Sequence, residues 1–342
     1  MFFLIFVMTV AVSAFLTYRI SRPGSWLAVA DLPNARSLHA QPIPRGGGIA
    51  IFSAVYLAGV LALLVGLPAG VEVFWLAGGS LMIGVVSYVD DCREVPARYR
   101  LAIHVVAAGL LIYGGVCPFD PYSPGFLWQP GSIAAAVATL LYIVWVINLY
   151  NFMDGMDGFA GGMTLVGFAF LAYFGWLQEA WPFFLLSMSI AAASLGFLLF
   201  NFPPARVFMG DVGSAPLGYM AAGLSLWGVR DGIFSFWVPV LLFSPFMVDA
   251  TVTLLQRLIR GENLWQAHCS HYYQRSVRLG WGHKKTVIAE YVLMVAAGFT
   301  AVYFSRLDNG TTVAAGLAAW MLVYVFLALN IHALERKTRR GE

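Results

Sequence analysis

The sequence predicts an all-α, polytopic membrane protein with about eleven transmembrane helices. Of its 342 residues, 60% are hydrophobic and only 11% are charged, whereas soluble domains average roughly 45–50% apolar and about 25% charged residues. So few polar side chains cannot cover the surface of a soluble protein of this size. The apolar runs are also far longer than the ~10-residue alternating segments of an outer-membrane barrel. The composition therefore excludes soluble, disordered, disulfide-stapled and β-barrel proteins.

Each predicted span is a mostly apolar segment of about 20 residues, the length that crosses a bilayer. The first has no charged region before it and no clear cleavage site, so we interpret it as a retained span and not as a removed signal peptide. No linker or repeat divides the chain, and residues 1–342 are expected to form one integral-membrane domain. The predicted spans cover residues 2–19, 47–66, 73–89, 101–117, 132–150, 159–178, 181–200, 213–229, 234–256, 286–305 and 312–334.

The basic residues predict the orientation of these spans, because cytoplasmic loops carry an excess of Lys and Arg. If the N-terminus lies outside, all but two of the 20 basic residues, Arg230 and Arg306, fall on the cytoplasmic side. We therefore expect a bacterial inner-membrane protein with a periplasmic N-terminus and a cytoplasmic C-terminus. The net charge of +3 is too small to indicate a nucleic-acid partner. The expected surroundings are membrane lipids.

Acidic side chains gather at the cytoplasmic ends of several predicted spans. Carboxylates at membrane depth are costly and usually functional. In the run NLYNFMDGMDG, the i, i+3 spacing of Asp154 and Asp157 places both carboxylates on one helical face if the segment is helical. Asp90 and Asp91 end the third span, and Asp211 opens the eighth. The recurrence of acids at one depth, from separate spans, predicts a functional site.

Each acid also has a structural interpretation, which the sequence leaves open. Asp90 and Asp91 can be solvated interface residues, and Asp211, which follows a glycine, can be a helix N-cap. The glycines beside Asp154 can serve only helix packing. Asp249, inside the ninth span, either helps to shape the site or makes an interhelical hydrogen bond.

The candidate ligands are hard oxygen atoms, which suit Mg²⁺ or Mn²⁺. The nearby arginines suit phosphate, which they bind in a bidentate manner. In the first cytoplasmic loop, Arg45, Arg36 and His39 are expected to contact phosphate or only to set the orientation. The run Gly46–Gly48 either offers backbone N–H groups to an anion or packs closely against another helix. Together these features predict phosphoryl transfer from a soluble donor to a lipid acceptor.

The chain resembles the polyprenyl-phosphate N-acetylhexosamine-1-phosphate transferases, relatives of the muramoyl-pentapeptide phosphotransferase. The resemblance covers nearly the whole chain and implies eleven spans with an outside N-terminus. It also implies the reaction: a UDP-N-acetylhexosamine gives its sugar 1-phosphate to undecaprenyl phosphate, UMP is released, and Mg²⁺ is required. The motifs that carry it are PNARSLHAQPIPRGGG, VDD, NLYNFMDGMDG, NFPPARVFMGDVGS and AHCSHYYQR.

The resemblance further implies roles for individual residues. Asp211 and Asn151 match the metal-binding positions. The catalytic candidates are Asp90 and Asp91, at the lipid phosphate or its deprotonation, Asp154 and Asp157, near the nucleotide sugar, and His271, in the last-loop motif that holds the diphosphate. The substrate-binding candidates are Asn201 and Phe208, for the uridine, together with Arg275, His268, Arg45 and His39.

One departure from the family pattern lies in the last loop, where many relatives carry a tight histidine cluster. Here the run is HYYQR, with His268 upstream, so His268 or Arg275 is expected to replace the missing histidines. This variant resembles the subgroup that starts O-antigen synthesis from UDP-N-acetylfucosamine or UDP-N-acetylquinovosamine. The oligomeric state stays open, a homodimer included.

The sequence also allows competing routes and functions to be weighed. A lipid phosphate is mostly dianionic at neutral pH, because its second pKa is about 6. Direct attack on the β-phosphorus is therefore favoured over a phospho-enzyme formed on Asp90 or Asp91. A secondary transporter or lipid flippase predicts charges near the bilayer midplane, whereas these acids lie at one surface. The aspartate motif of a CDP-alcohol phosphatidyltransferase is absent from the sequence.

Overall fold

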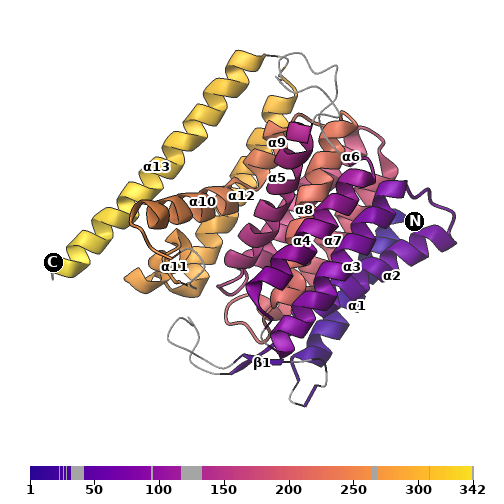
Figure 1. The fold of residues 1–342 in the computed structure, drawn as a ribbon, viewed down its shortest axis with the longest axis horizontal. Coiled ribbons are helices and arrows are strands. Elements are labelled where there is room, and N and C mark those ends of the chain that lie inside the picture. Colours follow the sequence, from indigo (N-terminus) through magenta and orange to yellow (C-terminus); the bar gives the residue numbers. More distant parts are fainter. Residues whose placement is uncertain are drawn as a thin grey trace.

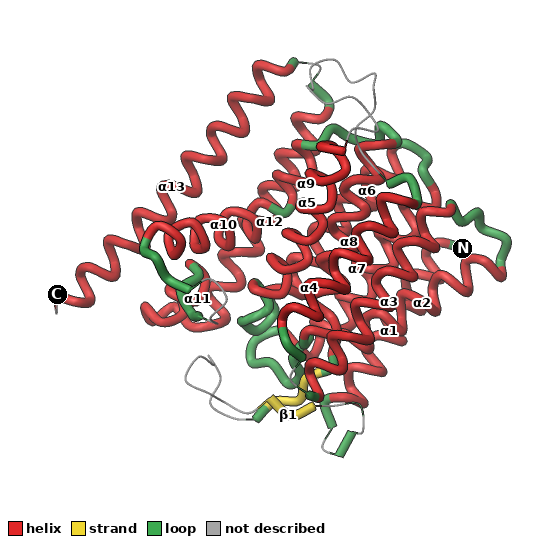
Figure 2. The backbone as a smooth tube through the Cα atoms, viewed as in Figure 1, coloured by secondary structure: helices red, strands yellow, loops and turns green. Residues whose placement is uncertain are grey.

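The computed structural model describes residues 1–22, 24–25, 27, 29–31, 42–93, 95–116, 133–263, 268–307 and 309–340. This part of the chain is built almost entirely from helices (Figures 1 and 2). Most of them run side by side in one bundle, whereas the C-terminal helix α13 leans away from it and packs against α11 and α12. The bounds are α1 (Phe2–Ile20), α2 (Gly47–Leu64), α3 (Val71–Cys92), α4 (Ala97–Tyr113), α5 (Ile133–Phe152), α6 (Phe159–Leu177), α7 (Trp181–Asn201), α8 (Asp211–Arg230), α9 (Trp237–Leu242), α10 (Ser244–Ile259), α11 (Tyr272–Ser276), the π-helix η1 (Val277–Trp281), α12 (Gly282–Ser305) and α13 (Gly310–Arg340).

Every predicted span coincides with helix in the structure, which confirms a helical protein with several apolar helices. Within the described residues, 8 helices are long and apolar enough to cross a membrane by length and composition. These are α1, α2, α3, α5, α6, α7, α13 and the stretch from α11 through α12. The predicted total of about eleven and the orientation of the termini stay predictions.

The ninth predicted span, 234–256, is not one helix. It is divided at Phe243 into the short helix α9 and the longer helix α10. Pro245 lies in the first turn of α10, where its missing N–H and fixed φ are tolerated, whereas the same residue inside a continuous helix would clash with the preceding turn. The break directs α10 away from the bundle (Figure 1).

Helix α8 lies at the centre of the bundle and packs against α3 and α5. All its residues from Val212 to Gly228 are buried. Its small side chains allow close approach: a Cβ on Gly48 of α2 would lie 2.2 Å from the Cα of Gly213. Small residues that let backbones meet are typical of helix packing in membranes. This contact fixes the start of α8, and with it Asp211, against the start of α2.

A two-stranded antiparallel sheet departs from the predicted all-α fold. It pairs β1 (Val29–Asp31) with β2 (Ile43–Arg45) just before α2. Each strand has only three residues, too few for an alternating pattern to be recognised in the sequence. Arg45 also forms a parallel bridge with Phe208, so the sheet is anchored to the segment that precedes α8.

The connections gather at two ends of the bundle. At the end that we call the site end, α3, α5 and α7 finish and α2, α4, α6 and α8 begin, with β1 beside them (Figure 1). At the opposite end, Arg230 of α8 pairs with Glu72 of α3 at 2.7 Å and donates to the carbonyl oxygen of Gly115. The two basic residues that the orientation rule sets apart, Arg230 and Arg306, both lie at helix ends away from the site end.

Candidate active site

One arginine joins the acids of two helices at the site end. Arg100 of α4 places its Nη1 atom 2.6 Å from Asp90 Oδ2 and 3.0 Å from Asp211 Oδ2. Asp90 is the third-last residue of α3, and Asp211 is the first of α8. The other oxygen of Asp90 accepts a hydrogen bond of 2.8 Å from the backbone N–H of Val95. The predicted convergence of these two acids is therefore present in the structure.

Asp91, the next residue of α3, lies between the first turn of α8 and Arg45. Its Oδ2 atom accepts a 3.2 Å hydrogen bond from the N–H of Val212, and its Oδ1 atom lies 3.9 Å from Arg45 Nη1. Gly210 has a φ of +76°, and a Cβ there would come within 2.9 Å of Asp91 Oδ2. Asp91 thus occupies space that only a glycine at 210 leaves open.

The turn between α5 and α6 supplies the next candidates. Asn151 donates from Nδ2 to the hydroxyl of Ser214 at 3.1 Å, which ties the end of α5 to the first turn of α8. Burial raises the pKa of Asp154 well above its usual range, and the charges of Asp211 and Asp91 add to the rise. Burial also raises the pKa of Asp211, against the hydrogen bond from Asn151. Three carboxylates from three segments therefore interact electrostatically.

Asp157 does not share a helical face with Asp154, because the helical segment on which that expectation depended is not present. Helix α5 ends at Phe152 and α6 begins at Phe159, so the acids lie in a non-helical turn. Asp157 is buried, accepts a 3.0 Å hydrogen bond from the N–H of Ala205, and lies 3.0 Å from Nδ1 of His283 on α12. It connects three segments around the acids, whereas Asp154 faces Asp211.

The segment between α7 and α8 is held by Asn201 and Phe208. Asn201 accepts from the N–H of Gly158 at 3.0 Å and donates to the carbonyl oxygen of Val207 at 2.9 Å. Phe208 donates its N–H to the carbonyl oxygen of Pro44 and accepts from the N–H of Gly47. Both candidates for the uridine therefore lie where β2, α6 and the start of α8 meet.

The glycine run before α2 serves packing. The N–H of Gly47 donates to Phe208 and that of Gly48 donates to the carbonyl oxygen of Met209, each at 2.9 Å. These donors are already engaged, and the Gly48 backbone contacts Gly213. Of the two interpretations that the sequence leaves open, the structure supports close packing over anion binding.

His271 lies beside the α5–α6 turn, immediately before α11. Its ring is 2% exposed and stacks on Phe152, with ring centroids 6.4 Å apart. Tyr273 donates its hydroxyl to the carbonyl oxygen of Phe152, and a Cβ on Gly155 would lie 2.2 Å from that hydroxyl. The last loop therefore packs directly on the turn that carries Asp154.

The other last-loop candidates have different surroundings. His268 lies next to His271, with ring centroids 4.8 Å apart, and burial together with the charge of His271 lowers the pKa of His268 to about 4. Arg275 pairs with Glu335 of α13 at 2.6 Å and contacts His332 at 2.9 Å. Its guanidinium thus lies on the α13 side of α11. His39 and Arg36 lie outside the described residues.

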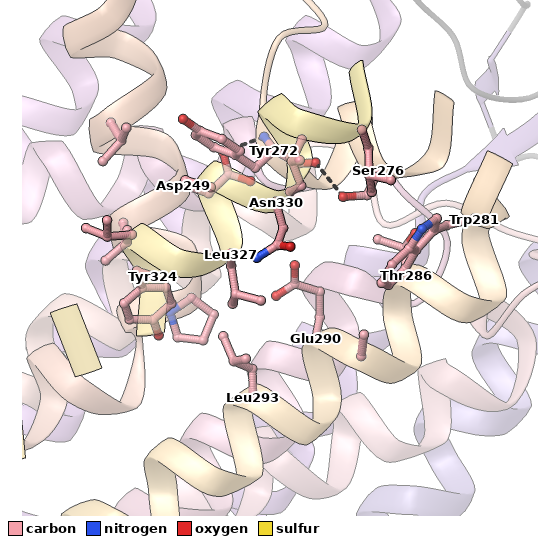
Figure 3. A pocket seen from close by; sticks show the side chains of 18 of the residues that line it. Asp249, Tyr272, Ser276, Trp281, Thr286, Glu290, Leu293, Tyr324, Leu327 and Asn330 are labelled. Atoms are coloured by element: carbon pink, nitrogen blue, oxygen red, sulfur yellow. Dashed lines mark hydrogen bonds between the residues drawn. The ribbon is translucent and has the colours of Figure 1, made fainter. Parts of the chain in front are cut away.

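A cavity of about 280 Å³ adjoins the last loop, between α10, α11, α12 and α13 (Figure 3). Its walls are mostly apolar. The carboxylate of Glu290 points into it, and Asp249 and Tyr272 form its edge toward His271. None of the acids around Arg100 lines this cavity.

Comparison with known proteins gives the chain its family. The sequence model of glycosyl transferase family 4 matches residues 73–229, which include Asp90, Asp154 and Asp211. The decaprenyl-phosphate N-acetylglucosaminephosphotransferase of Mycobacterium tuberculosis is 30% identical over 90% of this chain and 86% of its own. The chain belongs to glycosyl transferase family 4. Its membership, with several long apolar helices, identifies a multi-pass membrane protein.

Two further relatives show the range of the family. A probable undecaprenyl-phosphate N-acetylglucosaminyl 1-phosphate transferase of Bacillus subtilis is 29% identical over 87% of this chain and 83% of its own. The phospho-N-acetylmuramoyl-pentapeptide-transferase of Chloroherpeton thalassium is 29% identical over 78% of this chain and 80% of its own. These relatives are N-acetylhexosamine phosphotransferases, and two of their names specify a polyprenyl phosphate.

The residues of this family member fit a hard divalent cation. No group of three or more His, Cys, Asp or Glu side chains forms a ready metal cage within the described ranges. Mg²⁺ is usually bound by one or two carboxylates together with substrate phosphates and waters. The oxygens of Asp211, Asp154 and Asn151 provide such a partial set, and burial, with neighbouring carboxylates adding to it, raises the pKa of both acids.

Sequence reasoning missed one residue of this family member's site. His283, which pairs with Asp157, lies 126 residues away along the chain in α12, and no local pattern links them. For Asp249 the sequence left open whether it helps to shape the site or makes an interhelical hydrogen bond, and in the structure it contacts His271 at 3.3 Å. The signal for Asp249 was its depth within a predicted span.

Proposed function

We propose that this chain transfers N-acetylhexosamine 1-phosphate from a UDP-sugar to undecaprenyl phosphate, with release of UMP. The observation that carries the proposal is the pairing of Arg100 with Asp90 and Asp211, from three helices, beside Asp91 and Asp154. Such a concentration of carboxylates and arginines suits a cation and two phosphate groups in one place. The relatives named above are enzymes of this class.

In this proposal the carboxylates of Asp211 and Asp154, with the amide oxygen of Asn151, hold Mg²⁺ or Mn²⁺. The ion supplies positive charge that offsets the repulsion between the two phosphate groups. The Nδ2 atom of Asn151 donates to Ser214 and to Asp211, so the amide group lies beside the Asp211 carboxylate. Arg100 and Arg45 neutralise the same cluster of acids, and both are cations of the kind that bind phosphate.

The acceptor phosphate is expected at the end of α3. There the dianionic lipid phosphate attacks the β-phosphorus of the UDP-sugar, the bond from that phosphorus to the bridging oxygen breaks, and UMP leaves. Asp90 and Asp91 position the acceptor or take its remaining proton. Both carboxylates already accept backbone hydrogen bonds, from Val95 and Val212. Each bond engages an oxygen of the carboxylate and makes that oxygen a weaker nucleophile, which supports direct attack.

The uridine is expected against the segment between α7 and α8. Phe208 offers an aromatic face, and Asn201 holds this segment to the start of α6. Asp157, in the α5–α6 turn, and His283 of α12 brace the same region. The last loop, through His271, is expected to contact the diphosphate. These placements face the cytoplasm in the orientation predicted from the basic residues.

The sugar and the pathway are further parts of the proposal. The names of two relatives specify N-acetylglucosamine, and a third acts on a phospho-N-acetylmuramoyl-pentapeptide. UDP-N-acetylglucosamine is therefore one donor to test. The HYYQR run favours UDP-N-acetylfucosamine or UDP-N-acetylquinovosamine and a role in starting O-antigen synthesis at the inner membrane.

The test incubates purified protein with undecaprenyl phosphate, Mg²⁺ and each UDP-N-acetylhexosamine in turn, and measures UMP. We expect UMP with at least one donor, only when the lipid is present, and none with Asp211→Asn or Asp90→Asn. Glu179→Gln is a matched control, because Glu179 is an exposed acid between α6 and α7, at the opposite end of the bundle. Absence of UMP with every donor, or UMP formation by Asp211→Asn equal to that of the unchanged protein, would refute the proposal.

A further inference from the structure

Asp249 of α10 makes four contacts to or near the last loop. Its Oδ1 atom lies 3.3 Å from His271 Nδ1 and accepts the N–H of Tyr272 at 2.9 Å, and its Oδ2 atom accepts the N–H of Tyr273 at 3.0 Å. The hydroxyl of Thr253, one turn along α10, donates to Oδ1 at 3.1 Å. Figure 3 shows Asp249 directly against Tyr272. A buried carboxylate thus joins α10 to the start of α11.

The ring of His271 is held on its faces as well as at Nδ1. It is roughly parallel to the ring of Phe152 of α5, with an interplanar angle of 28°, and to that of Tyr273, with an interplanar angle of 15°. Its backbone N–H donates to the side chain of Gln274. Because the plane of the ring is set by two aromatic neighbours and Nδ1 is set by Asp249, the direction of Nε2 is fixed.

The contact also decides which nitrogen carries the proton. An ionised carboxylate only accepts hydrogen bonds, so Nδ1 of His271 must be the donor. In the neutral imidazole this leaves Nε2 as the acceptor, and in the imidazolium it leaves Nε2–H free to donate to an anion. A carboxylate that holds the second nitrogen of a functional histidine in this way fixes its tautomer and the orientation of its ring.

We infer that Asp249 is a positioning residue for His271, which it holds as the Nδ1–H tautomer with Nε2 directed toward the diphosphate of the donor. The part of the inference that names the donor diphosphate rests on the proposed function. The tautomer of His271 does not depend on that function. A purely structural role would limit Asp249 to capping the backbone of Tyr272 and Tyr273. A residue that only caps this backbone would not need the contact between Asp249 and Nδ1 of His271.

Other ionisable groups face the pair from each neighbouring element. His268 stacks on His271 from the same loop, and Tyr273 lies on the other side. Glu290 of α12 acts on Asp249 electrostatically, and Asp154 of the α5–α6 turn acts on Tyr273. The experiment therefore compares variants at one pH and reads out the nitrogen directly.

The first arm is a double-mutant cycle on kcat/KM with Asp249→Asn and His271→Gln. The amide oxygen of Asn still accepts a backbone N–H, but the carboxylate that fixes the imidazole is lost. We expect Asp249→Asn to lower kcat/KM by about 10- to 100-fold, the usual cost of losing such a partner, and to have little effect in the His271→Gln background. Equal losses in both backgrounds would show that Asp249 acts only as a cap.

The second arm records ¹⁵N spectra of the protein labelled at its 6 histidines, without substrate. The signal that His271→Gln removes is assigned to His271. We expect a protonated Nδ1 in the unchanged protein and a loss of that preference in Asp249→Asn. An unprotonated Nδ1 in the unchanged protein would overturn the inference, even if Asp249→Asn fails to fold. Because this arm needs no turnover, it also separates failure of the inference from failure of the proposed reaction.

Discussion

Arg100 on α4 holds Asp211 on α8 at 3.0 Å while it also contacts Asp90 on α3 at 2.6 Å. One cation therefore stands between two acids that belong to different helices and lie 121 residues apart in sequence. Without it, the carboxylates would repel each other at the end of the bundle. The same guanidinium is one-third exposed, so it can exchange a carboxylate for a phosphate oxygen when substrate binds.

Replacement of Arg100 tests this double role. We expect Arg100→Gln to lower kcat/KM by about 10- to 100-fold, since hydrogen bonds between charged groups contribute about 1.5–3 kcal/mol each. Arg98→Gln is the matched control, because Arg98 lies in the same turn of α4 but is exposed and packs over the ring of Tyr99. Steady-state kinetics on both variants make the comparison. Equal kcat/KM for Arg100→Gln and Arg98→Gln would contradict the assignment.

The metal assignment predicts a contrast between two acids of one turn. Asp154 faces Asp211, whereas Asp157 pairs with His283. We expect turnover to stop in EDTA and to return with Mg²⁺. The Mg²⁺ concentration for half-maximal rate should rise at least about tenfold in Asp154→Asn, as for lost ligands or their close partners, and stay near that of the unchanged protein in Asp157→Asn. If Asp157→Asn raised this Mg²⁺ concentration and Asp154→Asn left it unchanged, the ion would be assigned to Asp157 instead.

The direct-attack route predicts that no phospho-enzyme forms. Protein incubated with a UDP-N-acetylhexosamine labelled at the β-phosphorus, but without lipid, should carry no label after denaturation. The physical reason is that the backbone N–H groups of Val95 and Val212 already engage Asp90 and Asp91. Label retained by the unchanged protein and lost in Asp90→Asn or Asp91→Asn would establish the two-step route instead.

The glycine contact between α2 and α8 predicts a large effect of one methyl group on stability. A Cβ on Gly48 would lie 2.2 Å from backbone of α8, which cannot move aside as a flexible side chain would. We expect Gly48→Ala to destabilise the protein by about 1–3 kcal/mol, seen as a lower unfolding temperature in detergent. Gly59→Ala, on the same helix but with open space around it, should leave the unfolding temperature unchanged or slightly higher. Equal stability of the two variants would argue against this packing.

Much of the fold followed from composition and from the length of the apolar segments, because in a bilayer only a helix satisfies its own backbone within one segment. Each predicted span is helical. The alternation of helix direction then brings Asp90, Asp154 and Asp211 to one end, which is why their shared depth could be read from the sequence. Pro245 fits the break at Phe243 but would not have predicted it alone, since Pro216 lies inside the continuous helix α8.

What could not be predicted depends on contacts between distant segments. The strands β1 and β2 are too short to show a pattern. The pairing of Arg275 with Glu335 requires α13 to pass beside α11, and that of Asp157 with His283 requires α12 to approach α6. No local sequence pattern indicates that α13 lies beside α11 or that α12 lies beside α6. The i, i+3 spacing of Asp154 and Asp157 left open whether the segment is helical, and in the structure Gly155 and Gly158 lie in a turn instead.

The reaction class is the central claim, and the fate of the β-phosphorus tests it most directly. The protein is given undecaprenyl phosphate, Mg²⁺ and an accepted UDP-N-acetylhexosamine that carries ³²P only at the β-phosphorus, and the lipid and nucleotide products are separated. The account predicts that all transferred label appears in the lipid diphosphate sugar and that the nucleotide product is unlabelled UMP. Label that leaves as UDP, with an unlabelled sugar on the lipid, would contradict it.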